Sequence, residues 1–278
     1  MSEFPAMGRL SIEPLAASEV GSMSDYPRFA IVDCLVNRMD MPRALNAVEN
    51  RLRQGGGGYI CFSNVHTVVT SRNDPDLRAA TNNSFLSLPD GRPLSLYARL
   101  CGYQDVAQVA GPDFMEHCLA ALPGARHFFL GATENTLARL RATIEGRHPD
   151  AVIVGMYSPP FRPMTDDEHA TIVDMIRAAS PDFIWVGLGA PKQEKWMANN
   201  WEEFKPSILM GVGAAFDFHA GTVKRCPPWM RSVSLEWLYR LCREPRRLWK
   251  RYLVTNSLFL WYVASDALRG LARRKRCP

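Results

Sequence analysis

The chain of 278 residues is long enough for one large domain or two small ones with a full hydrophobic core. Its 47% hydrophobic and 22% charged residues are typical of a globular protein and exclude a globally disordered chain. Seven scattered cysteines form no CxxC pair and no Cys/His cluster, so we expect no disulfide framework, no zinc site and a reducing, cytoplasmic setting.

Charge is unevenly distributed along the chain. Residues 224–278 hold 14 Lys and Arg against three acidic residues, a net charge of +11, whereas residues 1–223 hold 19 against 25, a net charge of −6. A basic tail on an acidic body favours a partner that carries phosphate, such as anionic lipid or nucleic acid. We therefore divide the chain into a loosely ordered leader without an apolar signal segment (1–27), an α/β body (28–223) and a basic helical tail (224–278).

The body alternates short apolar runs with helical patterns. In its first half, the predicted elements are a strand at 29–36, a helix at 41–54, a strand at 59–63, a helix at 65–72, a strand at 84–91 and a helix at 92–102. Four glycines at 55–58 end the first helix, and Asn64 is a good N-cap for the second.

The second half repeats the strand–helix unit more clearly. Its predicted elements are strands at 126–132, 151–157, 182–190 and 207–218, and helices at 134–148, 166–180 and 191–204. Buried strands that alternate with helices of 12–15 residues predict an α/β fold, a Rossmann-like and mostly parallel sheet covered by helices on both faces.

Ligands of such sheets bind beside the carboxyl ends of the strands. The loops expected at that edge are SNVH, LPDG, LGATEN, GMYSPP, GLGAPKQE and GVGAAFD. In GLGAPKQE, Pro191 is expected to start a helix whose free N–H groups and dipole would stabilise a diphosphate. Each loop alone also fits an ordinary glycine turn. Several such loops at one edge favour a ligand site.

Few side chains in these loops suit acid–base chemistry. Asp90 follows an apolar strand, where a carboxylate can act as a general base or simply form a turn before Gly91. Asp217 offers the same choice, and we favour a loop-ordering role for it. The amide of Gln193 can read a sugar hydroxyl or a base edge, whereas Lys192 and Lys195 are expected to be solvated helix positions.

Several familiar chemistries are absent from the sequence. GxxxxGK[ST], GxSxG and HExxH do not occur, and GLGAPK lacks the third glycine of a dinucleotide fingerprint. Asp74-Pro75-Asp76 is formally a DxD motif, but its helix–loop context favours a turn over a metal site. The six histidines show no ligand spacing, so we expect no metal and no cofactor.

The C-terminal segment mixes Trp, Tyr and Leu with a dense series of arginines. Its mostly apolar stretch at 252–264 is well short of the ~20 residues that span a bilayer. Basic residues beside interfacial aromatics favour a helix that lies on an anionic membrane, and a domain-capping helix with a solvated basic face is the alternative.

Taken together and in order, these motifs resemble the WecG/TagA/CpsF family of bacterial glycosyltransferases, also called glycosyltransferase family 26. The matching motifs are Asn64, LPDGRP (88–93), VAGPDFM (109–115), FFLGA (128–132), VGLGAPKQEKW (186–196), GVGAAFDFHAG (211–221) and SLEWLYRLCREPRRLWKRY (234–252). Each motif is weak alone, but their combination over residues 29–262 is specific.

The resemblance implies a metal-independent, inverting transfer of a sugar from a UDP-sugar to a sugar carried on a polyprenyl diphosphate, in cell-surface or exopolysaccharide assembly. It implies that Asp90 is the catalytic base and that Arg240, Arg247 and Arg251 of the tail meet the lipid diphosphate or the leaving UDP. The candidate substrate-binding residues are Asn64, Gly91, Asp113, Gly131, Gly187, Gly189, Ala190, Pro191, Gln193, Glu194, Gly213 and Asp217.

The implied partners are a UDP-sugar donor, a polyprenyl-diphosphate-linked acceptor and the inner face of a bacterial cell membrane, with no nucleic acid and a possible homo-oligomer. The sequence departs from the family at Phe62, where many members carry a threonine proposed to act in the site; either Ser63 or Thr67 supplies that hydroxyl, or the role differs in this protein. A non-catalytic nucleotide-binding module with a basic tail for nucleic acid or membrane is the alternative function. Neither the donor sugar nor the pathway follows from these residues.

Overall fold

The computed structural model describes residues 26–162, 164–227, 230, 236–243 and 245–274. Most of the predicted leader therefore lies outside the described residues. Within the last two helices, the side chains at 240, 247, 248, 250, 251 and 267–274 also lie outside the description.

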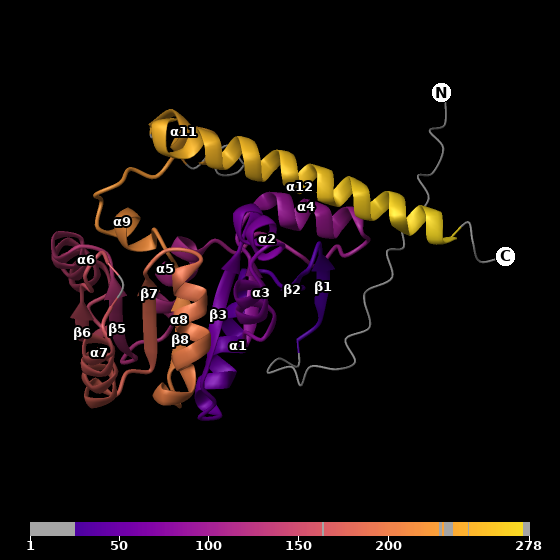
Figure 1. Ribbon diagram of the computed structural model, residues 1–278. Helices are drawn as coiled ribbons and strands as arrows, with labels where there is room; N and C mark the ends of the chain where they lie inside the picture. The colour runs from indigo at the N-terminus through magenta and orange to yellow at the C-terminus, as the bar shows by residue number, and fades with distance from the viewer. Residues whose placement is uncertain (1–25, 163, 228–229, 231–235, 244, 275–278) are drawn as a thin grey trace, which may run out of the picture.

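A six-stranded parallel sheet forms the centre of the molecule, in the order β4-β3-β8-β7-β5-β6. Its strands are β3 (Gly58–Ser63), β4 (Leu86–Pro89), β5 (Arg126–Gly131), β6 (Val152–Tyr157), β7 (Phe183–Gly187) and β8 (Ile208–Gly211). Helices cover both faces (Figure 1). The predicted α/β class with a Rossmann-like parallel sheet is confirmed.

Alternate side chains of each strand enter two separate cores. On one face, Phe129 and Trp185 pack with helices α1 (Met41–Arg53), α5 (Gly111–Ala121), α6 (Glu134–Arg147) and α9 (Ala215–His219). On the other face, Phe128 and Ile184 pack with α7 (Asp166–Ala179), α8 (Lys192–Asn200) and the 3-10 helix η1 (Trp201–Phe204). Because neighbouring strand residues point to opposite faces, the strands read as continuous apolar runs in the sequence.

Polar caps fix where several helices begin. Asn64 accepts a hydrogen bond from the Thr67 N–H at the start of α2 (Val65–Ser71), as its position after a strand predicted. Asp74 caps α3 (Pro75–Asn82) in the same way. The formal DxD motif is therefore a helix start rather than a simple turn, and Lys195 pairs with both of its carboxylates, at 2.8 Å and 3.6 Å. Lys195 is thus a link between α8 and α3, not the solvated charge that we expected.

The single strand expected over residues 29–36 is two strands of a hairpin. β1 (Arg28–Ile31) and β2 (Cys34–Asn37) pair antiparallel outside the main sheet. Val32, at a φ of 58°, turns the chain. Arg72, directly after α2, donates a hydrogen bond of 3.0 Å to the carboxylate of Asp33. The prediction was wrong because Asp33 is the one turn-forming residue here, and the residue with positive φ is the β-branched Val32, which seldom adopts that conformation.

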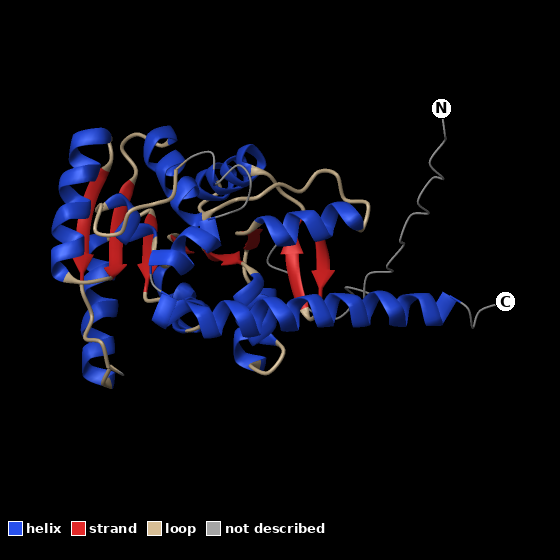
Figure 2. Cartoon of the chain, turned by 90° about the horizontal axis from the view of Figure 1, so that it is seen from above, coloured by secondary structure: helices blue, strands red, loops and turns tan. Residues whose placement is uncertain are grey.

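The chain ends in two helices, α11 (Glu236–Arg243) and α12 (Pro245–Arg274). In Figure 1 the yellow α12 runs over α2 and α4 (Arg92–Leu100), and Figure 2 shows it from above, extending past the hairpin. Phe259 of α12 is buried with residues of the hairpin, α2 and α4, and Arg72 lies over the ring of Tyr262. Helix α12 is therefore packed onto the body.

α12 also presents an apolar outer face. Trp249, Leu253, Leu260 and Trp261 are between 47% and 68% exposed. The spacings of four and seven residues keep Trp249, Leu253 and Leu260 on one side of the helix, and Trp261 is next to Leu260 in the sequence. None of the described helices is both long and apolar enough to cross a membrane.

Candidate active site

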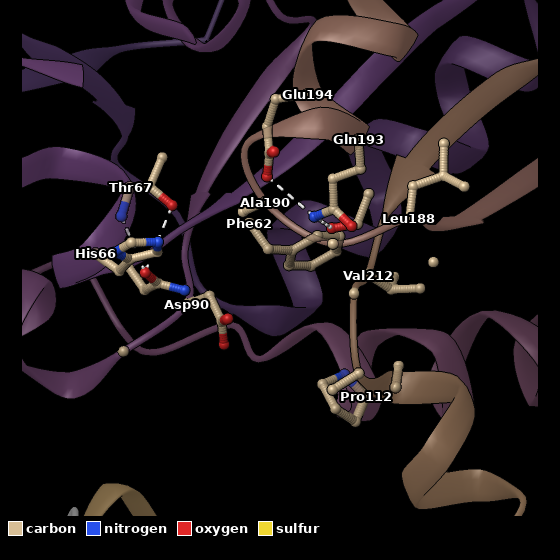
Figure 3. A pocket seen from close by; sticks show the side chains of 18 of the residues that line it. Phe62, His66, Thr67, Asp90, Pro112, Leu188, Ala190, Gln193, Glu194 and Val212 are labelled. Carbon is tan, nitrogen blue, oxygen red and sulfur yellow. Dashed lines mark hydrogen bonds between the residues drawn. The ribbon is translucent and has the colours of Figure 1, made fainter. Parts of the chain in front are cut away.

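A cavity of about 1190 Å³ lies at the carboxyl edge of the sheet. Every strand of the sheet sends a loop or helix start to its lining, represented by Asn64, Asp90, Ala132, Pro159, Gly189 and Gly213. Figure 3 shows the side chains of this region. The convergence of the six loops, which was predicted from their places after apolar strands, is therefore confirmed.

Asp90 lines the cavity directly after β4, half-buried. Its backbone N–H donates to the carbonyl of Ser63 at the end of β3, at 2.8 Å. The hydroxyls of Ser63 and Ser87 bond to each other at 2.8 Å and join the same two strands. Asp90 is thus held at the junction of two strand ends, with its carboxylate in the cavity (Figure 3). Gly91, the next residue, also lines the cavity.

The residues around Asn64 decide which hydroxyl faces the cavity. Phe62 lines the cavity and packs edge-on against Phe114, with the ring centroids 5.4 Å apart. The hydroxyl of Ser63 is buried in its bond to Ser87, and Ser63 is not part of the lining. Thr67 does line the cavity, beside Asn64. Of the two candidates for the missing family hydroxyl, the structure brings Thr67 to the cavity.

The GLGAPKQE loop forms one wall. Gly187, Gly189, Ala190, Gln193 and Glu194 all line the cavity, whereas Pro191 precedes α8 outside the lining. The N–H of Gln193, expected to be free for a diphosphate, instead donates to the carbonyl of Gly189 at 3.0 Å. The start of α8 therefore offers fewer free donors than its sequence indicated.

Gly131 and Gly187 have a packing role. A Cβ atom on Gly131, where φ is +127°, would lie 2.6 Å from the backbone of Gly187, and one on Gly187 would lie 2.8 Å from the Phe216 ring. Gly131 is not among the lining residues. The structure thus explains this glycine by the close approach of β5 and β7 and does not bring it to the cavity. Gly213, in contrast, lines the cavity at a φ of +55°.

Asp217 and Asp113 order their surroundings. Asp217 lines the cavity and accepts hydrogen bonds from the hydroxyls of Thr136 and Thr222, at 3.3 and 3.1 Å, consistent with the expected loop-ordering role. Asp113 does not line the cavity; its carboxylate holds Arg225, which does. Asp113 was predicted to bind substrate, but the structure places it against Arg225 and not in the cavity lining.

Sequence reasoning missed several polar residues of the lining, namely His66, Arg92, Arg225 and Glu236. His66 follows Asn64 by two residues, and Arg92 follows Asp90 by two. Both could have been found by including the first turn of the helix that follows each predicted site residue. Arg225 had no signal beyond its basic neighbourhood. Burial lowers the pKa of Arg225, whereas its pairing with Asp113 raises it, and the net result is a pKa above the ordinary value.

The two C-terminal helices form part of the cavity wall. Their lining residues are Glu236, Trp237, Tyr252, Thr255, Asn256, Phe259 and Leu260. Glu236 of α11 lies 3.7 Å from Nε of Arg225. Arg240 lies in α11, and Arg247 and Arg251 lie in α12, but their side chains lie outside the described residues.

The arrangement can support a group transfer between two large ligands. It combines a carboxylate fixed at a strand end, a guanidinium held by ion pairs and a wall of amide, carboxyl and aromatic groups. The carboxylate can accept a proton, and the guanidinium can stabilise developing negative charge on a leaving group. Helix α12, with its exposed apolar face, contributes to the same cavity.

Comparison with known proteins places residues 29–273 under the family model described as the glycosyl transferase WecG/TagA/CpsF family. A Bacillus subtilis (strain 168) protein, N-acetylglucosaminyldiphosphoundecaprenol N-acetyl-beta-D-mannosaminyltransferase, is 32% identical over 199 residues, which cover 71% of this chain and 75% of that protein. Proteins of the same name from Bacillus spizizenii (30% identical; 73% of this chain and 77% of that protein) and Staphylococcus aureus strain MW2 (30%; 60% and 64%) are also similar.

Proposed function

The chain belongs to the WecG/TagA/CpsF family of glycosyl transferases, and we propose that it moves a sugar from a UDP-sugar to a sugar carried on a polyprenyl diphosphate, with inversion at the anomeric carbon. The observation that carries this proposal is the position of Asp90 in a cavity that the C-terminal helices help to enclose. The similar proteins from Bacillus and Staphylococcus are named as transferases that act on a diphosphoundecaprenol-linked sugar.

In this proposal Asp90 is the general base. It takes the proton of an acceptor hydroxyl as that oxygen bonds to the anomeric carbon of the donor sugar, and the bond from that carbon to the UDP oxygen breaks on the opposite face. Asn64, directly after β3, and Thr67, in the first turn of α2, line the same cavity as Asp90 and orient the reacting hydroxyl. The fixed position of Asp90 between two strand ends supports this role.

The leaving diphosphate takes up negative charge and needs cations or N–H donors near it. Arg225 is held in the lining by Asp113 and is the described cation that we assign to this task. We propose that Arg240, Arg247 and Arg251 add to it, as the family resemblance implies. The reaction as proposed uses no metal ion.

We propose that the outer face of α12 rests on the inner surface of the bacterial cell membrane, where a polyprenyl diphosphate substrate resides. Exposed Trp249, Leu253, Leu260 and Trp261 supply the apolar contact, and the basic tail supplies attraction to anionic lipid. An acceptor head group anchored there can enter the cavity past α12. The product belongs to a cell-surface or exopolysaccharide assembly step.

A turnover assay tests the proposal. Purified full-length protein is mixed with a synthetic polyprenyl-diphosphate N-acetylglucosamine acceptor and, in turn, with UDP-N-acetylmannosamine, its uronic acid and UDP-glucose. We expect release of UDP and a lengthened lipid product with one of the donors, also in the presence of EDTA. Binding of UDP without product formation from any donor would instead favour a non-catalytic nucleotide-binding module.

A further inference from the structure

His219 is the last residue of α9, and both nitrogens of its ring face oxygen atoms of α5. Nε2 lies 3.0 Å from the carbonyl oxygen of Pro112, and Nδ1 lies 3.3 Å from Oε2 of Glu116. A carbonyl oxygen only accepts, so Nε2 carries a proton and donates to Pro112, in the neutral ring and in the charged ring alike. His219 therefore joins the end of α9 to the first two turns of α5.

The carbonyl that His219 binds belongs to the residue before Asp113. Pro112 lines the cavity (Figure 3), and the carboxylate of Asp113 holds the guanidinium of Arg225 through hydrogen bonds of 2.6 and 2.8 Å. The carbonyl group of Pro112 and the backbone nitrogen of Asp113 belong to one planar peptide unit. A hydrogen bond to that carbonyl therefore restrains the backbone from which the Asp113 side chain projects.

A second contact connects His219 with Arg225 through the neighbouring residue of α9. The guanidinium carbon of Arg225 lies 5.8 Å from the centre of the Phe218 ring, within the range of a cation–π contact. Phe218 and Arg225 both line the cavity. Because Phe218 directly precedes His219, a shift of the end of α9 would also move the ring over which the guanidinium lies.

The Glu116 carboxylate that faces His219 is held by a third element. Its Oε1 lies 3.2 Å from Nε2 of His148, the residue directly after α6. The side chain of His219 is 11% exposed and that of His148 is 12% exposed. None of these three described residues lines the cavity. They form a support behind its wall, where α5, α6 and α9 meet, and not a further contact with substrate.

We propose that His219 is a positioning residue for the sugar transfer: it holds the Pro112–Asp113 peptide and the Phe218 ring, and through them it keeps Arg225 in place for the diphosphate of the donor. This inference rests on the proposed function, in which Arg225 stabilises the leaving diphosphate, and adds to it a residue that does not touch the substrate. A charge-assisted contact depends steeply on its geometry, so a guanidinium that is held less firmly binds the diphosphate more weakly.

Substitutions of His219 test this role through kcat and KM for the UDP-sugar that the turnover assay identifies, and through the Kd for UDP. Leucine has no donor, whereas glutamine can place its amide N–H near the position of Nε2. We expect His219→Leu to lower kcat/KM and to weaken UDP binding about 5- to 10-fold, and His219→Gln to stay within about threefold of the wild type. His219→Asn, whose amide reaches only the position of Nδ1, should lose as much as His219→Leu and serves if the leucine variant does not fold.

A double-mutant cycle with Arg225→Gln distinguishes positioning from a general loosening of the fold. If His219 acts through Arg225, His219→Leu should lower kcat/KM less than about twofold once the guanidinium is gone. Tyr59→Phe is the matched control, because it removes another buried side-chain hydrogen bond to a helix carbonyl, that of Ala80, away from the cavity. We expect it to lower the melting temperature and to keep kcat/KM.

Four results would overturn the proposal. They are unchanged kcat/KM in both His219→Leu and His219→Asn, a loss in His219→Gln as large as in His219→Leu, fully additive losses in the cycle with Arg225→Gln, and an equal loss in Tyr59→Phe. Failure of the proposed function gives a different outcome. In that case the wild type binds neither UDP nor UDP-sugars, or Arg225→Gln binds them as tightly as the wild type does.

Discussion

The carboxylate of Asp113 binds the guanidinium of Arg225 through two hydrogen bonds of 2.6 and 2.8 Å, across 112 positions of the sequence. This pair joins the start of α5 to the segment that leads into α11, and Arg225 also approaches Glu236 of α11. The finding relates the family motif around Asp113 to the cavity. The aspartate positions a cation there.

We predict that Arg225→Gln lowers kcat/KM about 10- to 100-fold, because a charge-assisted contact to the diphosphate is lost. Asp113→Asn should give a smaller loss, since the guanidinium remains but is held less firmly. Steady-state kinetics with varied UDP-sugar measure both. Arg177→Gln, which breaks an exposed pair with Glu203 outside the cavity, is the matched control, and an equal loss in that variant would refute the assignment.

His127 should make the stability of the fold depend on pH. It is fully buried, accepts a hydrogen bond from Trp185 Nε1, and burial lowers its pKa from 6.5 to about 4. Below pH 6.5 His127 is protonated in the unfolded chain but stays neutral in the folded chain until the pH reaches about 4. The contribution of the neutral, buried His127 to the free energy of unfolding is therefore complete above pH 6.5 and is lost as the pH falls through 4. The loss amounts to about 3 kcal/mol at the acid end.

Urea unfolding at a series of pH values tests this effect of His127. The free energy of unfolding of His127→Phe should fall less steeply than that of the wild type between pH 6.5 and 4, although the variant loses its bond to Trp185 and starts from a lower value. Parallel curves for the two proteins would show that His127 is not the group responsible.

We predict that Gly131→Ala destabilises the fold by about 1–3 kcal/mol, because its Cβ would overlap the backbone of Gly187 at a positive φ. Gly146→Ala in α6 is the control: nothing lies within 4 Å of the added Cβ, and alanine should stabilise the helix by up to about 1 kcal/mol. Thermal unfolding of the two variants should therefore shift in opposite directions. A neutral Gly131→Ala would contradict the close approach of β5 and β7.

The membrane role of α12 predicts weaker binding to lipid when its outer face is made polar. Leu253→Ser combined with Trp261→Ser should reduce sedimentation with vesicles that contain anionic phospholipid, because two side chains that are more than 60% exposed and outside the cavity lining leave the contact. Met175→Ser, on the exposed surface of α7, should sediment like the wild type. Equal sedimentation of the double variant and the wild type would speak against this face as the membrane contact.

Much of the fold was predictable from local patterns. Buried strands produced continuous apolar runs, and a cap such as Asn64 marks the start of a helix in the sequence itself. The hairpin turn at Val32 was not predictable, because its backbone turns at a residue that seldom adopts positive φ.

The candidate site divides along the same line. The edge rule for parallel sheets led to Asp90 and Gln193, which line the cavity. Gly131 and Asp113 were grouped with them by motif, yet one serves strand packing and the other holds Arg225. Arg225 and the cavity-lining part of α12 depend on contacts between distant parts of the chain, which periodicity and spacing do not encode.

The most direct test of the proposed mechanism compares turnover and UDP binding in Asp90→Asn. The amide keeps the size of the side chain but cannot take the acceptor proton, so we expect turnover to fall at least 100-fold while the Kd for UDP and the melting temperature change little. Asp76→Asn, a similar change at a carboxylate that is 85% exposed and outside the cavity, should keep full turnover. Near-normal turnover by Asp90→Asn would contradict the assignment of the base.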